Sequence, residues 1–143
     1  MNKIVVGIDD SPGARAALRW AVGQAKVTGA KIEAVYAFDF HVTWDEEPGV
    51  QFEDWRSRAE LLARESLNEV LADVSLSPDD GLISAVAVEG SPAPILIAAS
   101  MDADLLVVGS RGRGGFGGLL LGSVSQHCVG HAKCPVVVVP APS

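Results

Sequence analysis

The hydrophobic residues of this chain gather in five short runs, separated by longer segments with helical spacing. The runs are Ile4–Ile8, Ile32–Phe38, Leu82–Val88, Leu105–Val108 and Val136–Val139. The first, fourth and fifth are almost continuous in Val, Ile and Leu, which is typical of strands covered on both faces of a sheet. The pattern therefore predicts five strands.

The segments between the runs predict four helices. In the first, Ser11 is a candidate N-cap, Pro12 suits the first turn, and apolar residues recur at three- and four-residue spacing until Gly29 offers a stop. The other three are expected from the apolar stripe through Trp55–Leu71, from a second cap signal at Ser91-Pro92, and from Gly122-Ser123 to a point before Pro135.

Strands and helices thus alternate along the chain, which favours a parallel sheet joined by right-handed crossovers. The expected fold is α/β: an open, doubly wound, five-stranded parallel sheet, Rossmann-like, with strand order 3-2-1-4-5 and four helices on both faces. A length of 143 residues suits one hydrophobic core, so we expect a single domain over residues 1–143.

One segment fits no element. Residues 39–54 carry six acidic side chains and no Lys or Arg. We expect a solvated acidic loop that enters the second helix. A lid over a ligand site is the alternative, because long loops at the ends of a sheet often carry function.

The charge of the chain is uneven. The net charge is −7, yet all 18 acidic residues precede residue 105, and residues 105–143 hold three bases and no acid. An acidic protein binds nucleic acid poorly, but an acid-free segment can hold one small anion. There is neither an apolar run of the ~20 residues that a membrane helix needs nor a secretory leader, so we expect a cytoplasmic protein without membrane or nucleic-acid partners.

A glycine-rich loop is the strongest functional signal. Seven of the 15 glycines lie between Gly109 and Gly122, after a buried strand and before a helix. Glycine lets backbone N–H groups approach a ligand closely, and the helix that follows adds unpaired amides and the positive end of its dipole. Ser123 and Ser125 can add hydroxyl donors, and Arg111 and Arg113 add positive charge. The loop therefore predicts a phosphate site.

Two common phosphate motifs do not fit. Residues 112–117 have G-x-G-x-x-G spacing, but no acid follows Asp104 to hold a ribose as in a dinucleotide fingerprint. Residues 117–122 have P-loop spacing, but Ser123 stands where the lysine is required. With two arginines, no lysine and no carboxylate base in the loop, we expect at most slow ATP hydrolysis and favour a regulator over an enzyme.

The full spacing is Gly109-x2-Gly112-x9-Gly122-Ser123. With residues 4–9 and Ser11 at the start, 107–111 before the loop and 131–139 at the end, the sequence resembles the universal stress protein family, whose ATP-binding members carry G-x2-G-x9-G-[S/T]. The resemblance covers the whole chain except the acidic segment 39–54.

The resemblance implies that ATP, accompanied by Mg²⁺, binds at the carboxyl edge of the sheet. Gly109 and Gly112 would hold the ribose–phosphate region, Asp9 the nucleoside and Ala37 the adenine. The implied binding residues are Gly7, Asp9, Ala37, Val108, Gly109, Arg111, Gly112, Gly122, Ser123, Val124 and Ser125. In a sheet of order 3-2-1-4-5, strands one and four are neighbours where the order reverses, so we expect Asp9 and Gly109 to face each other there.

Two alternatives stay open: a protein-interaction dimer that binds no nucleotide, and a binder of AMP or a cyclic nucleotide. Val136–Val139 would be an apolar edge strand without a charge, which favours an isologous homodimer through that strand; dimers of this kind are also what the resemblance implies.

Other chemistry-bearing residues have simpler interpretations. Asp10 is expected in a turn or cap. His127 and His131 lie four apart near Cys128 and Cys134, but no paired zinc-ligand spacing occurs, so we expect packing roles and reduced thiols.

Overall fold

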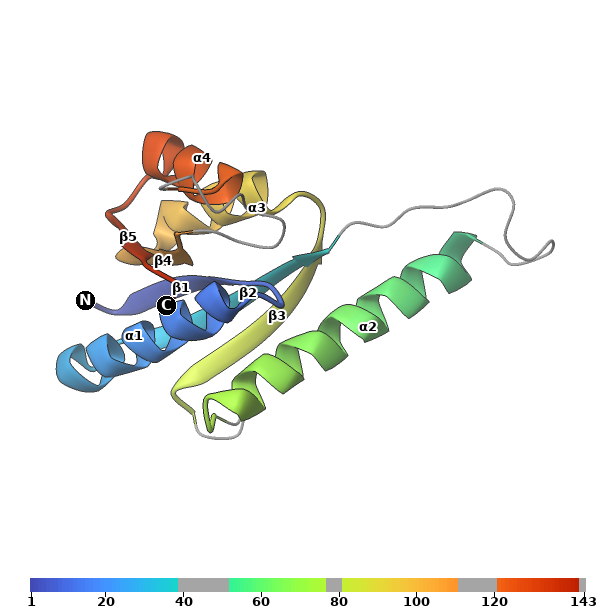
Figure 1. The fold of residues 1–143 in the computed structure, drawn as a ribbon, viewed down its shortest axis with the longest axis horizontal. Helices are drawn as coiled ribbons and strands as arrows, with labels where there is room; N and C mark the ends of the chain where they lie inside the picture. The colour runs from blue at the N-terminus through green and yellow to red at the C-terminus, as the bar shows by residue number, and fades with distance from the viewer. Residues whose placement is uncertain (39–51, 77–80, 111–120, 142–143) are drawn as a thin grey trace.

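The computed structural model describes residues 1–38, 52–76, 81–110 and 121–141. Strands and helices alternate throughout these ranges (Figure 1). In chain order they are β1 (Lys3–Ile8), α1 (Pro12–Thr28), β2 (Lys31–Phe38), α2 (Phe52–Asp73), β3 (Ile83–Glu89), α3 (Pro92–Ala99), a 3-10 turn (Ser100–Asp102), β4 (Leu105–Gly109), α4 (Ser123–His131) and β5 (Val136–Val139).

The five strands form one sheet in the order β3-β2-β1-β4-β5, and all four pairings are parallel. This confirms the predicted strand order. The central strand β1 is fully buried at Ile4, Val5 and Val6, as its continuous apolar sequence predicts.

The helices cover both faces of the sheet, also as predicted (Figure 1). Side chains of α1 and α2 share one buried cluster with strand residues such as Ile4 and Val107. Leu96 of α3 and Cys128 of α4 share a second cluster with alternate strand residues, among them Val5 and Leu106. Because successive strand residues point to opposite faces, the two clusters use alternate positions of the same strands.

The ends of α1 follow the predicted signals. Ser11 Oγ accepts a hydrogen bond of 3.2 Å from Ala14 N, and Pro12 begins the helix. Gly29 ends it at φ 78°, a left-handed conformation that glycine adopts without a steric penalty, and donates its N–H to Ala25 O at 2.8 Å.

Two details differ from the sequence-based expectation. Ser91 occupies the N-cap position of α3, but its side chain makes no cap hydrogen bond. The helix α2 begins at Phe52, so residues 52–54 of the acidic segment belong to a helix. The remaining residues of the acidic segment, 39–51, lie outside the described part of the chain.

Candidate functional site

The sequence predicts a site where the order of the strands in the sheet reverses. From β1 the chain crosses to β2 on one side, and β4 joins β1 on the other. The last bridged pair between β1 and β4 is Val6 with Val107, although the strands continue to Ile8 and Gly109. The ladder therefore ends before the strands do, at the place where open α/β sheets bind ligands.

Gly109 brings the end of β4 against the first turn of α1. A Cβ at this position would lie 3.0 Å from both the carbonyl carbon and the carbonyl oxygen of Gly13. Only a residue without a side chain allows this approach, so Gly109 brings the start of α1 to the switch point.

Gly7 serves the opposite face. A Cβ there would lie 2.7 Å from Leu96 Cδ1 and 3.4 Å from Val108 Cγ1. Gly7 thus lets α3 pack closely on β1. The side chain of Val108 is itself buried in the core beneath α3 and α4, so Val108 can meet a ligand only through its backbone.

Asp9 follows β1 directly and is half-buried. Its Oδ1 accepts a hydrogen bond of 2.8 Å from Ser11 N and a second, short one from Ser11 Oγ. Ile8 pairs with Tyr36, and continuing this register brings Asp9 beside Ala37, the half-buried residue proposed for the adenine pocket. Asp10 accepts a hydrogen bond of 3.0 Å from the Tyr36 hydroxyl at Oδ2.

The start of α4 presents backbone amides at this edge. Gly122 is extended at the N-cap, and the first intrahelical hydrogen bond runs from Gln126 N to Gly122 O at 3.0 Å. The amides of Ser123, Val124 and Ser125 precede that bond, and such first-turn N–H groups have no acceptor within their own helix. With the helix dipole they favour an anion.

The hydroxyl of Ser125 differs from the prediction. It is buried and donates within the fold, at 2.9 Å to Ser110 O and 3.0 Å to Gly122 O. The sequence predicts a hydroxyl donor for phosphate at this position, but the buried hydroxyl is bound within the protein. Ser123 is exposed at the first position of the helix.

Ser110 is a residue that the sequence analysis did not assign. Its carbonyl accepts from Gly122 N at 2.6 Å and from Ser125 Oγ, while its N–H donates to Val139 O at 2.8 Å. Ser110 therefore ties the start of α4 to the ends of β4 and β5. The available signal was its position, a small polar residue directly after a buried strand.

Nine of the eleven implied binding residues lie in the described part of the chain. Those at the carboxyl edge, either at strand ends or at the start of α4, are Asp9, Ala37, Gly109, Gly122, Ser123, Val124 and Ser125. Gly7 and Val108 are the packing residues described above, each one residue before the end of its strand. Arg111 and Gly112 lie outside the described residues.

The described residues contain no group of three or more His, Cys, Asp or Glu side chains able to hold a metal ion. His127 and His131 stack with ring centroids 6.4 Å apart, and His127 Nδ1 lies 2.8 Å from Ser123 O. Burial raises the pKa of Cys128 to about 11, so its thiol stays protonated at neutral pH.

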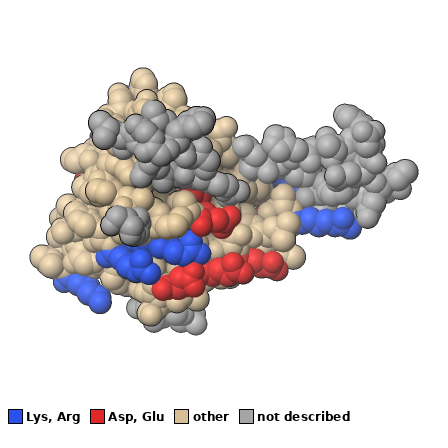
Figure 2. Space-filling model, viewed as in Figure 1, with Lys and Arg blue, Asp and Glu red and all other residues tan. Residues whose placement is uncertain are grey.

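Charged side chains gather over two helices on one face of the molecule. Figure 2 shows Lys and Arg side chains over α1 beside a row of Asp and Glu side chains over α2. The two helices are linked by an ion pair of 2.8 Å between Arg15 Nε and Asp73 Oδ2. Within the ranges that the structure describes, no helix has the length and apolar character needed to span a membrane.

Residues 1–140 match the model of the universal stress protein family, and the chain belongs to this family. Among curated relatives, Universal stress protein Rv2623 of Mycobacterium tuberculosis is 37% identical over 140 residues, which cover 95% of this chain and 46% of that protein. Universal stress protein Rv2005c of the same organism is 41% identical over 136 residues, covering 94% and 44%. The chain thus spans about half the length of these relatives.

Solved structures share the fold. Universal stress protein UspA from Lactobacillus plantarum superposes with a TM-score of 0.69 at 22% identity, covering 96% of this chain and 97% of that one. A universal stress protein in complex with cAMP superposes with a TM-score of 0.64 at 26% identity, covering 99% of this chain and 98% of that one. A universal stress protein family protein from Arabidopsis thaliana with AMP bound superposes with a TM-score of 0.62 at 22% identity, covering 100% of this chain and 93% of that one.

Proposed function

We propose that this chain is a nucleotide-binding regulator that binds ATP, accompanied by Mg²⁺, at the carboxyl edge of β1 and β4. The observation that carries the proposal is the start of α4. Its first three amides precede any intrahelical bond, and its N-cap, Gly122, donates a hydrogen bond to Ser110, the residue directly after β4. A polyanion is the ligand that such amides and a helix dipole favour.

The nucleotide's parts have separate partners in this proposal. The amides of Ser123, Val124 and Ser125 would bind phosphate oxygens, with the Ser123 hydroxyl as an additional donor. Asp9 and Ala37, adjacent by register, would meet the nucleoside, and the backbone of Gly109 the ribose–phosphate region. Gly112 and Arg111, from the loop outside the described residues, would complete the phosphate contacts.

Mg²⁺ fits this site only as a companion of the nucleotide. Mg²⁺ is commonly held by one or two carboxylates together with substrate phosphates and water. The described residues have no carboxylate cluster for it, so the phosphates would supply its main ligands. The role of the metal would be to neutralise phosphate charge beside an acidic protein.

AMP or a cyclic nucleotide is the second candidate ligand. Two structural relatives are solved with cAMP and with AMP, and the adenosine contacts alone would serve all three nucleotides. The start of α4 separates them, because ATP offers two more phosphates than AMP to the same amides. We therefore expect the order ATP, then AMP, then cAMP in affinity.

Isothermal titration of the whole chain with Mg-ATP tests the proposal. Gly122→Val should weaken binding at least about tenfold, because the branched side chain crowds the buried N-cap beside the amides. Ser123→Ala should weaken it by a smaller factor. Gly130→Val is the matched control on the same helix, since a Cβ at Gly130 meets nothing within 4 Å. Equal affinity in the wild type and the Gly122 variant would reject the α4 site.

The second part of the proposal is a homodimer through β5. Pro135 O accepts from Leu106 N at 3.0 Å and Val139 O from Ser110 N at 2.8 Å, so alternate residues of β5 bond β4. By that alternation Val136 and Val138 direct their N–H and C=O groups to the outer edge of the sheet. An apolar edge strand of this kind favours pairing with a second copy.

Light scattering during size-exclusion chromatography tests this dimer. Val138→Pro removes one outward N–H and keeps the β4 ladder, so the mass should fall from two chains to one. Val138→Ala keeps that N–H and should remain dimeric. A wild-type mass of one chain would reject the dimer. A dimer that binds no nucleotide at all in the titration above would instead favour the protein-interaction alternative.

A further inference from the structure

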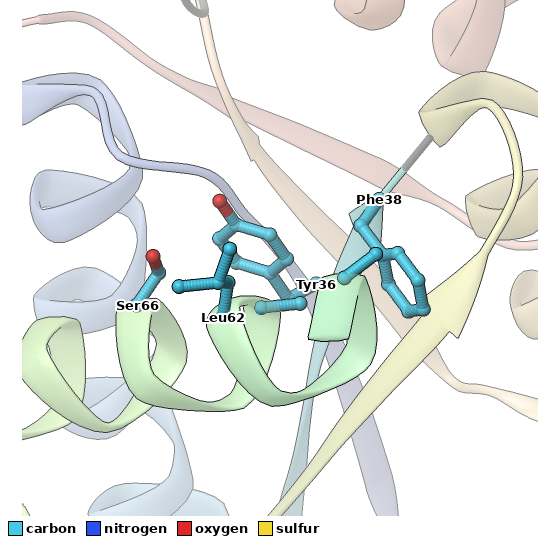
Figure 3. A pocket seen from close by; sticks show the side chains of 6 residues that line it. Tyr36, Phe38, Leu62 and Ser66 are labelled. Carbon is cyan, nitrogen blue, oxygen red and sulfur yellow. The ribbon is translucent and has the colours of Figure 1, made fainter. Parts of the chain in front are cut away.

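A cavity of about 210 Å³ that opens to solvent lies between the end of β2 and α2. Figure 3 shows Tyr36 and Phe38 reaching into it from the strand and Leu62 and Ser66 from the helix. Ala59 and Ala63 complete its lining. We propose that this cavity binds a small, uncharged aromatic molecule of one ring or two fused rings, at a site separate from the nucleotide.

The size of the cavity limits the ligand. An apolar cavity of roughly 150 Å³ is enough to bind benzene, whereas pockets for drug-sized ligands run to roughly 300–1,000 Å³. The volume here lies between these values. A phenol or an indole fills a volume of this order, whereas a nucleotide would extend beyond it into solvent.

The lining determines the chemistry of the ligand. None of the six lining residues carries a charge, and two are aromatic, which favours offset or edge-to-face contact with a ring. The lining also holds no cation that could pair with an anionic ligand. Burying an unpaired charge is unfavourable, so a neutral ring is preferred over a benzoate.

The exposure of Leu62 supports a ligand here. Leu62 lines the cavity, yet 62% of the residue is exposed. Leu67, the next leucine along α2, is 2% exposed. An apolar ring in the cavity would remove part of the Leu62 surface from water, which stabilises the complex in proportion to the area covered.

The cavity and the nucleotide site lie on opposite faces of β2. Tyr36 packs in the cluster beneath α1 and α2, with Phe38 partly buried against it. Ala37, between them in sequence, points the other way because strand residues alternate. A molecule in the cavity therefore does not occupy the adenine position proposed above.

Titration with indole, followed by NMR chemical shifts of the whole chain, tests this site. We expect saturable binding with a dissociation constant on the order of 0.1–1 mM, as for a tight fragment of its size. The shifts should centre on Tyr36, Phe38 and Ser66. Benzoate, similar in width but charged, should bind at least about tenfold more weakly.

Ala59→Phe fills the cavity from α2 and should weaken indole binding at least about tenfold. Ala72→Phe is the matched control, an exposed alanine on the same helix, and should bind indole as the wild type does. Thermal unfolding of both variants checks that they fold. If Ala59→Phe does not fold, Ser66→Leu replaces it, with the same expected loss.

The proposal would be overturned if indole did not saturate the protein, or if the chemical shifts centred on other residues. Equal indole binding by the folded Ala59→Phe variant would also overturn it. Loss of indole binding as the chain concentration rises would instead assign the cavity to a second copy of the chain. Mg-ATP affinity should be unchanged by Ala59→Phe. Because that arm is measured separately, failure of the nucleotide proposal would be distinguished from failure of this one.

Discussion

Two glycines at the centre of the sheet show how a missing side chain positions a helix. Gly7 admits Leu96 of α3 on one face, and Gly109 admits the backbone of Gly13 in α1 on the other. The two positions differ in what a new side chain would meet. At Gly7 it meets the flexible end of a leucine, whereas at Gly109 it meets backbone that cannot move without shifting the helix.

Gly109→Ala is therefore expected to destabilise the protein by about 1–3 kcal/mol, because the new Cβ forces the first turn of α1 outward. Gly23→Ala is the control within α1, where a Cβ meets nothing within 4 Å. It should stabilise by about 0.5–1 kcal/mol through helix propensity. Urea unfolding measures both changes, and effects of the same sign would contradict this account of Gly109.

Asp104 contributes to the stability of the protein against acid. Its Oδ2 accepts from Asn2 N at 2.6 Å and Lys3 N at 3.0 Å, and these backbone hydrogen bonds lower its pKa from 3.8. A carboxyl group whose pKa is lower in the folded state stabilises the fold at pH values above its pKa in the unfolded state. This stabilisation is lost as the pH falls through the pKa of the folded state.

Asp104→Asn should accordingly be less stable than the wild type at neutral pH. The difference should shrink as the pH falls below about 4 and vanish once the wild-type carboxyl is protonated. Urea unfolding of both proteins across this range measures the difference. A constant gap at all pH values would show that the asparagine changes packing rather than charge.

At the scale of elements, the two Ser-Pro starts look alike in sequence and differ in the structure. Ser11 caps α1 through its side chain, whereas Ser91 at α3 makes no cap hydrogen bond. Ser11→Ala should therefore cost about 1 kcal/mol in stability, and Ser91→Ala should cost only a few tenths. Thermal unfolding of the two variants measures this difference. Equal losses would contradict the distinction.

The elements themselves were predictable because they follow from local periodicity. Continuous apolar runs marked β1, β4 and β5, and the cap and stop signals of α1 fell on the residues that perform those roles. The parallel sheet also followed, since strands that alternate with helices are joined by right-handed crossovers, and the expected strand order is confirmed. The first turn of α2 was harder to predict, because residues 52–54 belong to the acidic segment and precede the apolar stripe that begins at Trp55.

The hydrogen-bond partners of the side chains at the site could not be predicted from the sequence. A serine in the first turn of a helix reads as an available hydroxyl, but the Ser125 hydroxyl is buried against Ser110 O. That bond depends on the end of β4 lying beside the start of α4, which is a tertiary fact. The cavity between β2 and α2 is likewise set by packing between elements far apart in sequence.

At the scale of the whole molecule, charge and function lie at different places. Lys3, Asp102 and Asp104 form a charged group at the amino edge of the sheet, where β1 and β4 begin. The row of acidic side chains lies over α2 (Figure 2). The proposed nucleotide site is at the opposite, carboxyl edge. Its phosphate-binding residues lie in the segment 105–143, which contains no acid, whereas Asp9 and Asp10 follow β1 at the same edge.

This separation predicts how salt should act on nucleotide binding. The net charge of −7 repels ATP, and salt screens that repulsion. Salt also screens the attraction by the α4 dipole. At an ionic strength of about 0.1 M charges more than roughly 10 Å apart hardly interact, so the local attraction dominates.

Raising NaCl from about 50 to 500 mM should thus weaken ATP binding several-fold and AMP binding less. Isothermal titration at each salt concentration measures both affinities. Tighter ATP binding in salt would mean that the acidic surface governs the site.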